Sequence, residues 1–217
     1  MGHVILLTQQ KGGAGKTTLL TALAAHLAGT GATVRLIDLD PQRSTTDWAA
    51  ARAGSGLAPV EAIESAEWRA RSDIVAARGG ADWTFVDAPG SADSIGRSAM
   101  RAADLALVPC QPSMADVWAT GATLRHLADT GLAHAVVFNR VPPRGRVAEA
   151  AMAEAATLGA PILPVRMGQR SAYAEAFMRG RGPGELARPG RAGEEIAALA
   201  GALAAVVAGT PAEALAG

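Results

Sequence analysis

Short runs of apolar residues alternate along the chain with longer segments that have helical patterns. The runs are nearly continuous in Val, Ile and Leu, which is typical of parallel strands buried on both faces of a sheet. They predict strands at residues 3–8, 33–38, 83–87, 105–109, 135–139 and 161–165. The longer segments predict helices at residues 16–28, 45–53, 67–78, 94–102, 115–130, 147–158, 171–178 and 192–208. The alternation predicts an α/β fold, with a doubly wound, mostly parallel sheet and helices on both faces.

Length and composition place this pattern in a single globular domain that spans residues 1–217. Hydrophobic residues make up 49% of the chain and charged residues 18%, which excludes a disordered protein. The one cysteine, Cys110, excludes a disulfide framework and is interpreted as a packing residue. No apolar stretch has the roughly 18 residues of a membrane span, and no export signal precedes the first strand. We therefore expect a cytoplasmic protein without a membrane partner.

Aromatic residues are few, and the four tryptophans show no periodic arrangement. They occupy positions 48, 68, 83 and 118. Without a regular spacing they do not predict a stacking platform for bases. We expect them in the core or in helix–helix contacts.

The charge balance is uninformative as a total but unusual in detail. Twenty basic and twenty acidic residues give a net charge of zero, which taken alone argues against a nucleic-acid-binding domain. Only two of the basic residues are lysines, Lys11 and Lys16, and the other eighteen are arginines. In a chain that otherwise uses Arg, these two neighbouring positions indicate a need for an ammonium group.

Both lysines belong to the segment QKGGAGKTT, residues 10–18, which follows a predicted strand and opens a predicted helix. This is the context of a phosphate-binding loop. Its glycines let successive backbone N–H groups converge on phosphate oxygens, and the helix N-terminus adds a partial positive charge. We expect Lys16 to reach the β- and γ-phosphates of ATP and the Thr17 hydroxyl to bind Mg²⁺. The full set of predicted nucleotide-binding loop residues is Gly12, Gly13, Ala14, Gly15, Lys16, Thr17 and Thr18.

The loop departs from the common G-x-x-x-x-G-K-[ST] form, because Gln10 replaces the first glycine and Lys11 follows it. A second lysine in such a loop needs an anionic partner of its own. The segment KGGAGKT resembles the deviant Walker A motif of the ParA/MinD ATPases, and thus a P-loop NTPase fold. The resemblance implies that Lys11 is a catalytic signature lysine that reaches the ATP of the other subunit in a sandwich homodimer.

Two further segments place acids after predicted strands. Asp38 and Asp40 lie in IDLDPQ and point to the same side of the carboxyl edge of the sheet, where ligands of α/β proteins bind. The resemblance implies that Asp40 activates the attacking water and that Asp38 lies near the metal; an alternative is that both acids cap the next helix. Asp87 in WTFVDAPG fits a Walker B acid that holds Mg²⁺. Gly90, which follows it, suits a segment that senses the γ-phosphate.

The strand that ends in VVFNR carries the candidate adenine contact. The resemblance places a base-contacting residue here, and the Asn139 amide suits a purine edge. Arg140 offers stacking on the base as an alternative, and either residue could instead cap the loop.

Counted by segment, the charge is uneven. Residues 140–191 contain nine arginines and four glutamates, an excess of five positive charges, whereas residues 192–217 contain three glutamates and no basic residue. With few aromatic residues, the basic segment favours contact with the phosphate backbone rather than base reading. Residues 162–176 resemble the segment in which small ParA proteins place DNA contacts; the alternative is an ordinary solvated surface. The predicted DNA contacts are Arg166, Arg170, Arg179, Arg181 and Arg191.

The resemblance extends over nearly the whole chain and is closest to small ParA partition ATPases, so we expect no N-terminal helix-turn-helix domain. It implies an ATPase that dimerises on ATP, binds DNA without sequence preference and partitions a plasmid or chromosome with a cargo-bound adaptor that stimulates hydrolysis. The main alternative keeps the mechanism and positions a protein assembly, such as a chemoreceptor cluster or a carboxysome. A biosynthetic P-loop enzyme is less favoured. A MinD-like membrane cycle would need a basic C-terminal helix, but the sequence has no Lys or Arg after Arg191. A nitrogenase-reductase-like protein would need cluster cysteines, but Cys110 is the one cysteine.

Overall fold

The computed structural model describes residues 2–89, 94–188, 190–212 and 214. Over these residues the chain forms a seven-stranded sheet in the order β3-β2-β4-β1-β5-β6-β7, and every neighbouring pair is parallel. The strands are β1 (His3–Leu7), β2 (Val34–Asp38), β3 (Glu61–Glu64), β4 (Trp83–Asp87), β5 (Leu105–Cys110), β6 (His134–Val141) and β7 (Ile162–Gly168).

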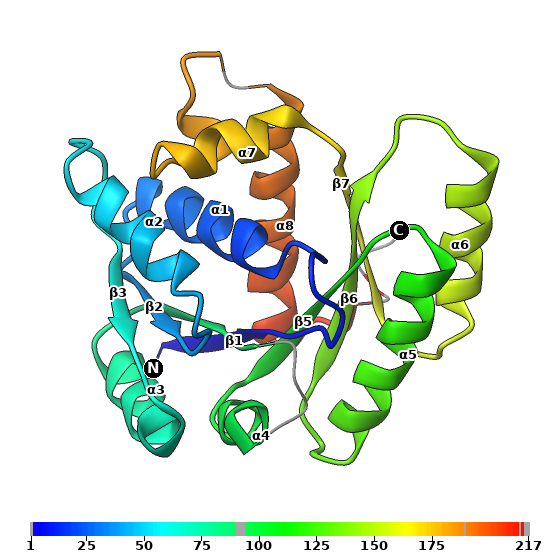
Figure 1. Ribbon diagram of the computed structural model, residues 1–217, viewed down its shortest axis with the longest axis horizontal. Coiled ribbons are helices and arrows are strands. Elements are labelled where there is room, and N and C mark those ends of the chain that lie inside the picture. The colour runs from blue at the N-terminus through cyan, green and yellow to red at the C-terminus, as the bar shows by residue number, and fades with distance from the viewer. Residues whose placement is uncertain (1, 90–93, 189, 213, 215–217) are drawn as a thin grey trace.

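Helices cover both faces of the sheet, as the alternation of apolar runs and helical segments predicts (Figure 1). One face carries α1 (Lys16–Gly29), α2 (Ser44–Ala53), α7 (Ser171–Met178) and α8 (Arg191–Val207). The other carries α3 (Ala70–Gly79), α4 (Ser94–Met100), α5 (Met114–Ala128) and α6 (Arg146–Ala156). Two short 3₁₀ helices, η1 (Glu67–Arg69) and η2 (Pro183–Glu185), complete the described elements.

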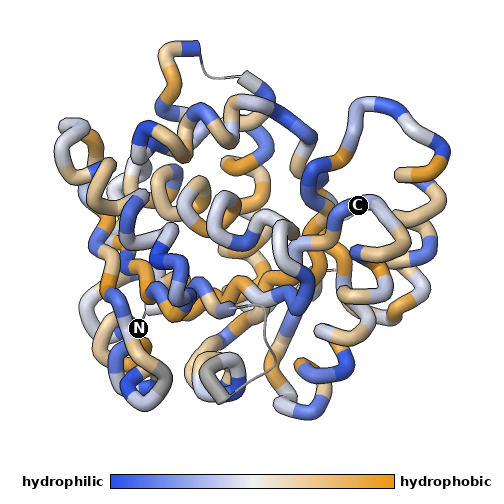
Figure 2. The backbone as a smooth tube through the Cα atoms, in the orientation of Figure 1, coloured by the Kyte–Doolittle hydropathy of each residue, from blue (hydrophilic) through white to orange (hydrophobic). Residues whose placement is uncertain are grey.

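Each face of the sheet has its own hydrophobic core. Along β1, Ile5 and Leu7 join the core under α1 and α8, whereas Val4 and Leu6 join the core under α3 and α5. Because both faces are covered, the inner strands β1, β4, β5 and β6 are apolar at most positions rather than at alternate ones. Figure 2 shows hydrophobic segments through the middle of the molecule. None of the helices in the described part of the chain is long and apolar enough to cross a membrane.

The predicted strands and helices are confirmed, with differences at two places. Strand β3 was not predicted; it is a four-residue edge strand with a glutamate at each end, so it carries almost no apolar signal. The segment predicted as one helix over residues 67–78 is divided into η1 and α3.

The expectation for the tryptophans is half wrong. Trp48 and Trp83 are buried in the core, but Trp68 and Trp118 are 83% and 69% exposed. Trp68 lies in η1 and Trp118 in the first half of α5. Both are therefore surface residues of the single subunit.

The register of the central strands sets the geometry of the site. Asp38 at the end of β2 and Leu7 at the end of β1 both pair in register with Asp87 at the end of β4. The loop after β1 and the acids of β2 and β4 therefore meet at the carboxyl edge of the sheet, where α/β proteins bind their ligands.

Candidate nucleotide-binding site

The predicted phosphate loop connects the central strand β1 to α1. Gly13 and Gly15 have φ angles of +81° and +90°, a left-handed conformation that side chains disfavour. A Cβ on Gly15 would also lie 2.4 Å from Nδ2 of Asn139. Because Gly15 is the N-cap and has no side chain to accept a hydrogen bond, the first N–H groups of α1 face the loop, where an anion is stabilised.

Gln9, which sequence reasoning missed, fixes the start of this loop. Its side chain is completely buried. Its Nε2 donates to the Pro109 carbonyl at 3.2 Å and to Oγ1 of Thr120 at 2.9 Å, while Oε1 accepts from Oγ1 of Thr123 at 2.9 Å. The amide thereby ties the loop to β5 and α5. A polar residue directly after a buried strand was the available signal.

The two lysines have different surroundings. Lys16 Nζ donates to the Gln9 carbonyl at 3.3 Å, inside the curve of the loop. Lys11 Nζ forms an ion pair with Oδ2 of the buried Asp116 at 2.6 Å. The anionic partner that Lys11 was expected to need is thus supplied, in the single subunit, by the first turn of α5. Asp116 was not predicted, although Ser113, which caps α5, marked that turn in the sequence.

Asp87 is a buried acid at the end of β4. Its Oδ2 accepts hydrogen bonds from the hydroxyls of Thr17 and Thr45, both at 2.7 Å, while its buried Oδ1 has no partner among the described residues. Burial, together with the nearby charge of Asp38, raises the pKa of the Asp87 carboxyl to about 6, although the hydrogen bonds from Thr17 and Thr45 oppose this rise. An unpartnered, desolvated carboxylate oxygen next to a threonine hydroxyl fits the surroundings of a hydrated Mg²⁺ ion. No group of three or more His, Cys, Asp and Glu side chains that could hold a metal alone occurs in the described part of the chain.

Asp38 and Asp40 have separate roles in the structure. Oδ2 of Asp38 accepts from the backbone N–H and the hydroxyl of Thr46, both at 2.9 Å, so Asp38 does cap the first turn of α2. Asp40 is half-buried and lies on a cavity of about 430 Å³ that Trp68 also lines. Its Oδ1 accepts from the Gln42 N–H at 2.9 Å. Of the two acids, Asp40 is the one that faces solvent.

Asn139 braces the phosphate loop. Its buried amide donates through Nδ2 to the Ala14 carbonyl at 2.8 Å and accepts through Oδ1 from the Arg140 N–H at 2.9 Å. The loop-capping alternative therefore describes Asn139 in this structure. Arg140 is exposed and has a φ of +53°. The adenine contact of either residue stays a prediction, and Gly90 lies outside the described residues.

The predicted DNA-contacting arginines lie on β7, at the two caps of α7, between α7 and α8, and at the start of α8. Each of four has an acidic or carbonyl partner: Arg166 is 3.7 Å from Glu149, Arg170 pairs with Glu195, Arg179 is 3.3 Å from Glu175, and Arg181 donates to the Glu185 carbonyl at 3.1 Å. Arg191 is exposed at the start of α8.

Arg170 is held more firmly than the others. Its Nε donates to Oε1 of Glu195 at 2.8 Å, and the Tyr173 hydroxyl and the Gly168 N–H donate to Oε2 of the same carboxylate at 2.9 and 3.1 Å. Burial raises the pKa of Tyr173, so its hydroxyl keeps the proton that it donates. Glu195 thus fixes the loop between β7 and α7 to α8.

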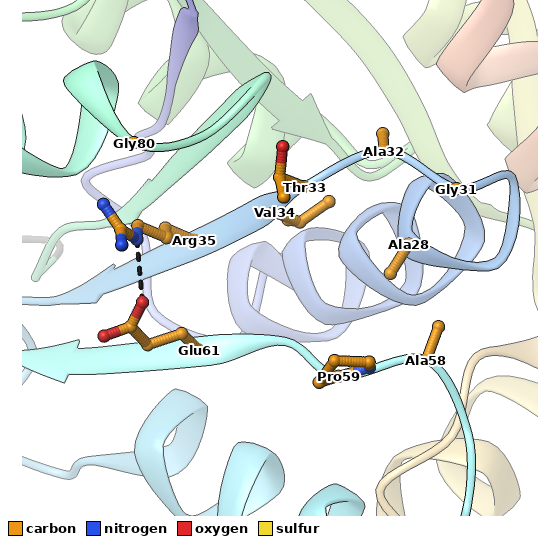
Figure 3. Close-up of a pocket in the computed structure, with 10 residues that line it drawn as sticks. All are labelled: Ala28, Gly31, Ala32, Thr33, Val34, Arg35, Ala58, Pro59, Glu61 and Gly80. Carbon is orange, nitrogen blue, oxygen red and sulfur yellow. Dashed lines mark hydrogen bonds and ion pairs between the residues drawn. The ribbon is translucent and has the colours of Figure 1, made fainter.

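A second cavity, of about 400 Å³, lies at the opposite end of β2 (Figure 3). Small apolar residues and an Arg35–Glu61 ion pair of 2.7 Å line it. It contains none of the predicted nucleotide-binding residues, so the candidate site remains the carboxyl edge of the sheet.

Comparison with known proteins gives consistent matches. The family model of the CobQ/CobB/MinD/ParA nucleotide binding domain matches residues 5–183. "Protein ParA" of Rhizobium radiobacter is 33% identical over 188 residues, which cover 82% of this chain and 83% of that protein. The maintenance of carboxysome distribution protein A of Halothiobacillus neapolitanus is 31% identical over 193 residues, 86% and 89% of the two chains. The structure of cobyrinic acid a,c-diamide synthase from Mycobacterium smegmatis with an ATP analogue and magnesium superimposes with a TM-score of 0.81 at 18% identity, covering 98% of each chain.

Proposed function

Because the chain belongs to the CobQ/CobB/MinD/ParA family of nucleotide-binding ATPases, we propose that it positions cargo through an ATP-dependent cycle of dimerisation and DNA binding. The observation that carries this proposal is the pair of lysines in one phosphate loop. Lys16 faces the interior of the loop, whereas Lys11 turns away from it to Asp116. Lys16 alone can supply the ammonium group for the phosphates of a nucleotide bound in its own subunit, so Lys11 is available for an anionic partner outside that subunit.

The residues around Asp87 fit Mg²⁺-ATP. Thr17 and Asp87 would hold the metal, with Asp38 behind them, and the metal would neutralise phosphate charge as hydrolysis proceeds. The N–H groups from Gly12 to Thr18 and the Lys16 ammonium bind the phosphates. Asp40 accepts the hydrogen bond of the attacking water and orients it, because it is the solvent-facing acid at this edge.

Dimerisation follows from Lys11. In the single subunit its charge is neutralised by Asp116. When two subunits face each other, Lys11 exchanges that carboxylate for the phosphates of the ATP held by the other subunit, and the homodimer is stable only while ATP is present.

DNA binding follows from dimerisation, because the dimer has two copies of a basic surface that carries little charge in one subunit. The exposed arginines Arg166, Arg179 and Arg191, with Arg170 and Arg181 beside them, provide a basic surface that is weak in one subunit and bivalent in the dimer. ATP thereby controls DNA affinity. The protein is cytoplasmic in this proposal and associates with the nucleoid when ATP is bound.

The cargo is a plasmid or chromosome, bound through an adaptor that stimulates hydrolysis. The ParA relative supports this choice, and the carboxysome-distribution relative supports the second candidate, a protein assembly as cargo. The likeness to a biosynthetic synthase, at 18% identity, concerns the fold alone.

The proposal is tested by measuring binding to a random-sequence DNA duplex with Mg-ATP, with Mg-ADP and without nucleotide, over a series of salt concentrations. We expect tight binding with ATP alone and a steep loss of affinity as salt rises. Sedimentation of the same samples should show a dimer with ATP only. A monomer in all three conditions, or DNA binding that ignores the nucleotide, would overturn the proposal and favour the biosynthetic alternative.

A further inference from the structure

Helix α2 connects two regions that are far apart in the sequence: the acids of the nucleotide site and the segment between α7 and α8. We call residues 179–188 of that segment the Arg-rich loop. At the N-terminal end of α2, Thr45 donates to Asp87 and Thr46 to Asp38. The helix has ten residues, so its two ends are about 15 Å apart.

The C-terminal end of α2 holds the Arg-rich loop through Arg52. This arginine is only 2% exposed. Its NH1 and NH2 donate to the two carboxylate oxygens of Glu185, both at 2.8 Å, and NH1 also donates to the Gly180 carbonyl at 3.2 Å. Nε donates to the Ala58 carbonyl at 2.8 Å, so every nitrogen of the guanidinium group is used. The Arg52 side chain therefore fixes the position of the Arg-rich loop relative to α2.

Two further contacts press the loop against α2. Trp48 Nε1 donates to the Arg181 carbonyl at 3.4 Å. Gly180 has a φ of +63°, and a Cβ there would lie 2.4 Å from the Arg52 backbone nitrogen. The loop backbone therefore packs directly on the helix backbone, with no side chain between them that could absorb a shift.

A purely structural contact would not need this chemistry. A buried ion pair often stabilises a protein no more than a well-packed apolar pair would, so its advantage here is that it fixes an orientation. The Arg52 fork fixes the position and orientation of a loop whose own side chains include Arg179, Arg181 and Arg188. Because a helix moves as a rigid body, a shift of its first turn at the nucleotide site also shifts Arg52.

We infer that α2 transmits the occupancy of the nucleotide site to the Arg-rich loop, with Arg52 as the positioning residue. Thr45 and Thr46 contact the acids beside the bound Mg²⁺-ATP, and Arg52 sets the placement of the arginines that face DNA. This inference rests on the proposed function, because it assigns the loop a contact with DNA that ATP controls. It adds the route by which one site affects the other.

The test is the Arg52→Lys variant, which keeps the charge but loses the fork. The quantity measured is the ratio of DNA affinity with Mg-ATP to that with Mg-ADP. A coupling free energy changes this ratio by roughly 5- to 150-fold, and we expect the variant to lower it at least about fivefold while ATP affinity without DNA stays unchanged. A structural defect would instead lower the affinity in both nucleotide states alike. An unchanged ratio in a folded variant overturns the inference.

The matched control is Arg35→Lys. It changes the Arg35–Glu61 pair, which has a similar N–O distance and lies near the N-terminal end of β2, away from the nucleotide site (Figure 3). This variant should keep the parent's ratio. If Arg52→Lys does not fold, Glu185→Gln takes its place, because Glu185 lies nearer the surface and an amide oxygen can still accept one bond from Arg52. In Glu185→Gln the ratio of DNA affinities should also fall, but by less than in Arg52→Lys. A ratio equal to that of the parent would count against the inference.

A second measurement needs no DNA. Amide hydrogen exchange over residues 179–188 should differ between the Mg-ATP and Mg-ADP states of the parent, and this difference should disappear in Arg52→Lys. If parent and variants all fail to bind DNA while exchange behaves as expected, the DNA contact of the proposed function is wrong and the coupling through α2 stands. If exchange over this loop ignores the nucleotide in the parent, the coupling is wrong whatever the DNA result.

Discussion

The nucleotide site and the basic surface differ in how their charged groups are compensated. We call this basic surface, which contains Arg166, Arg170, Arg179, Arg181 and Arg191, the arginine-rich surface. In the nucleotide site, Asp38 and Asp87 are buried, and one oxygen of Asp87 has no partner among the described residues, as the proposed Mg²⁺ site requires. On the arginine-rich surface, most cations already have a partner, such as Glu149 for Arg166 and Glu195 for Arg170. A count of charges in the sequence cannot separate these two situations. The difference teaches that the burial and the partners of each charged group say more about a ligand than the total of the charges does.

The largest effect is expected when Lys16, the cation of the nucleotide site, is removed. Lys16→Ala should lower ATP hydrolysis by roughly 1000-fold and abolish tight ATP binding, because the loss of one preorganised charge in a phosphate site has effects of this order. Steady-state hydrolysis and calorimetric titration with Mg-ATP measure the two effects. Lys11→Ala is the control, since it should keep ATP binding by the single subunit and lose the dimer. Near-parent hydrolysis in Lys16→Ala would contradict the assignment of the loop.

The junction of the two regions is the buried pair Arg52–Glu185. Arg52→Ala leaves a buried carboxylate without its partner and should lower the free energy of unfolding by about 3–5 kcal/mol. The control is Arg179→Ala, in which an exposed pair on α7 is lost and about 0.3–0.5 kcal/mol is expected. Denaturant unfolding of both variants gives the comparison. Equal losses would mean that burial does not distinguish the two pairs.

Within the nucleotide site, Asp40→Ala separates binding from hydrolysis. The variant should bind ATP and dimerise like the parent and hydrolyse about 100-fold more slowly, because a positioned base contributes roughly this factor. Single-turnover hydrolysis, together with sedimentation in Mg-ATP, provides the measurement. If Asp40→Ala hydrolyses ATP as fast as the parent, another group must orient the attacking water.

On the arginine-rich surface the expected effects are smaller. The double variant Arg166→Ala with Arg179→Ala should weaken DNA binding in Mg-ATP about tenfold and reduce the salt dependence by about two counterions. Both side chains are more than half exposed, unlike Arg170, which is one-third exposed. Arg101→Ala with Arg125→Ala removes the same charge elsewhere and should leave binding unchanged. If the control pair has the larger effect, the DNA surface lies on the other face.

Most of the fold could be predicted because its strands are buried on both faces. Six strands stood out as apolar runs, whereas β3 escaped because a short edge strand that begins and ends with glutamate has no such run. The phosphate loop and Asp87 were predicted because backbone geometry and chemistry restrict these positions to few residue types, and the roles of Asp38 and Asp40 were predicted from the family resemblance. The sequence does not show which side chains contact each other in the folded protein. Gln9 and Asp116, which act through such contacts, were therefore missed.

Arg52 shows how a signal can be present and overlooked. Thr45, Trp48, Ala49 and Arg52 follow the helical spacing of a buried face, and all four are buried. An arginine that completes such a face needs a carboxylate opposite it. Glu185 is 133 residues away, and only the tertiary structure brings the two together.

The strand order also affects how the chain can fold as it is synthesised. Strand β1 pairs with β4 on one side and with β5 on the other, and β5 ends at Cys110. The earliest strand of this sequence to leave the ribosome therefore waits for roughly half of the chain before both of its edges are covered. Until then its apolar residues, and the phosphate loop that they anchor, have no completed sheet to join. The part of the molecule that is most restricted by its chemistry therefore cannot become fully ordered before about half of the chain has been made.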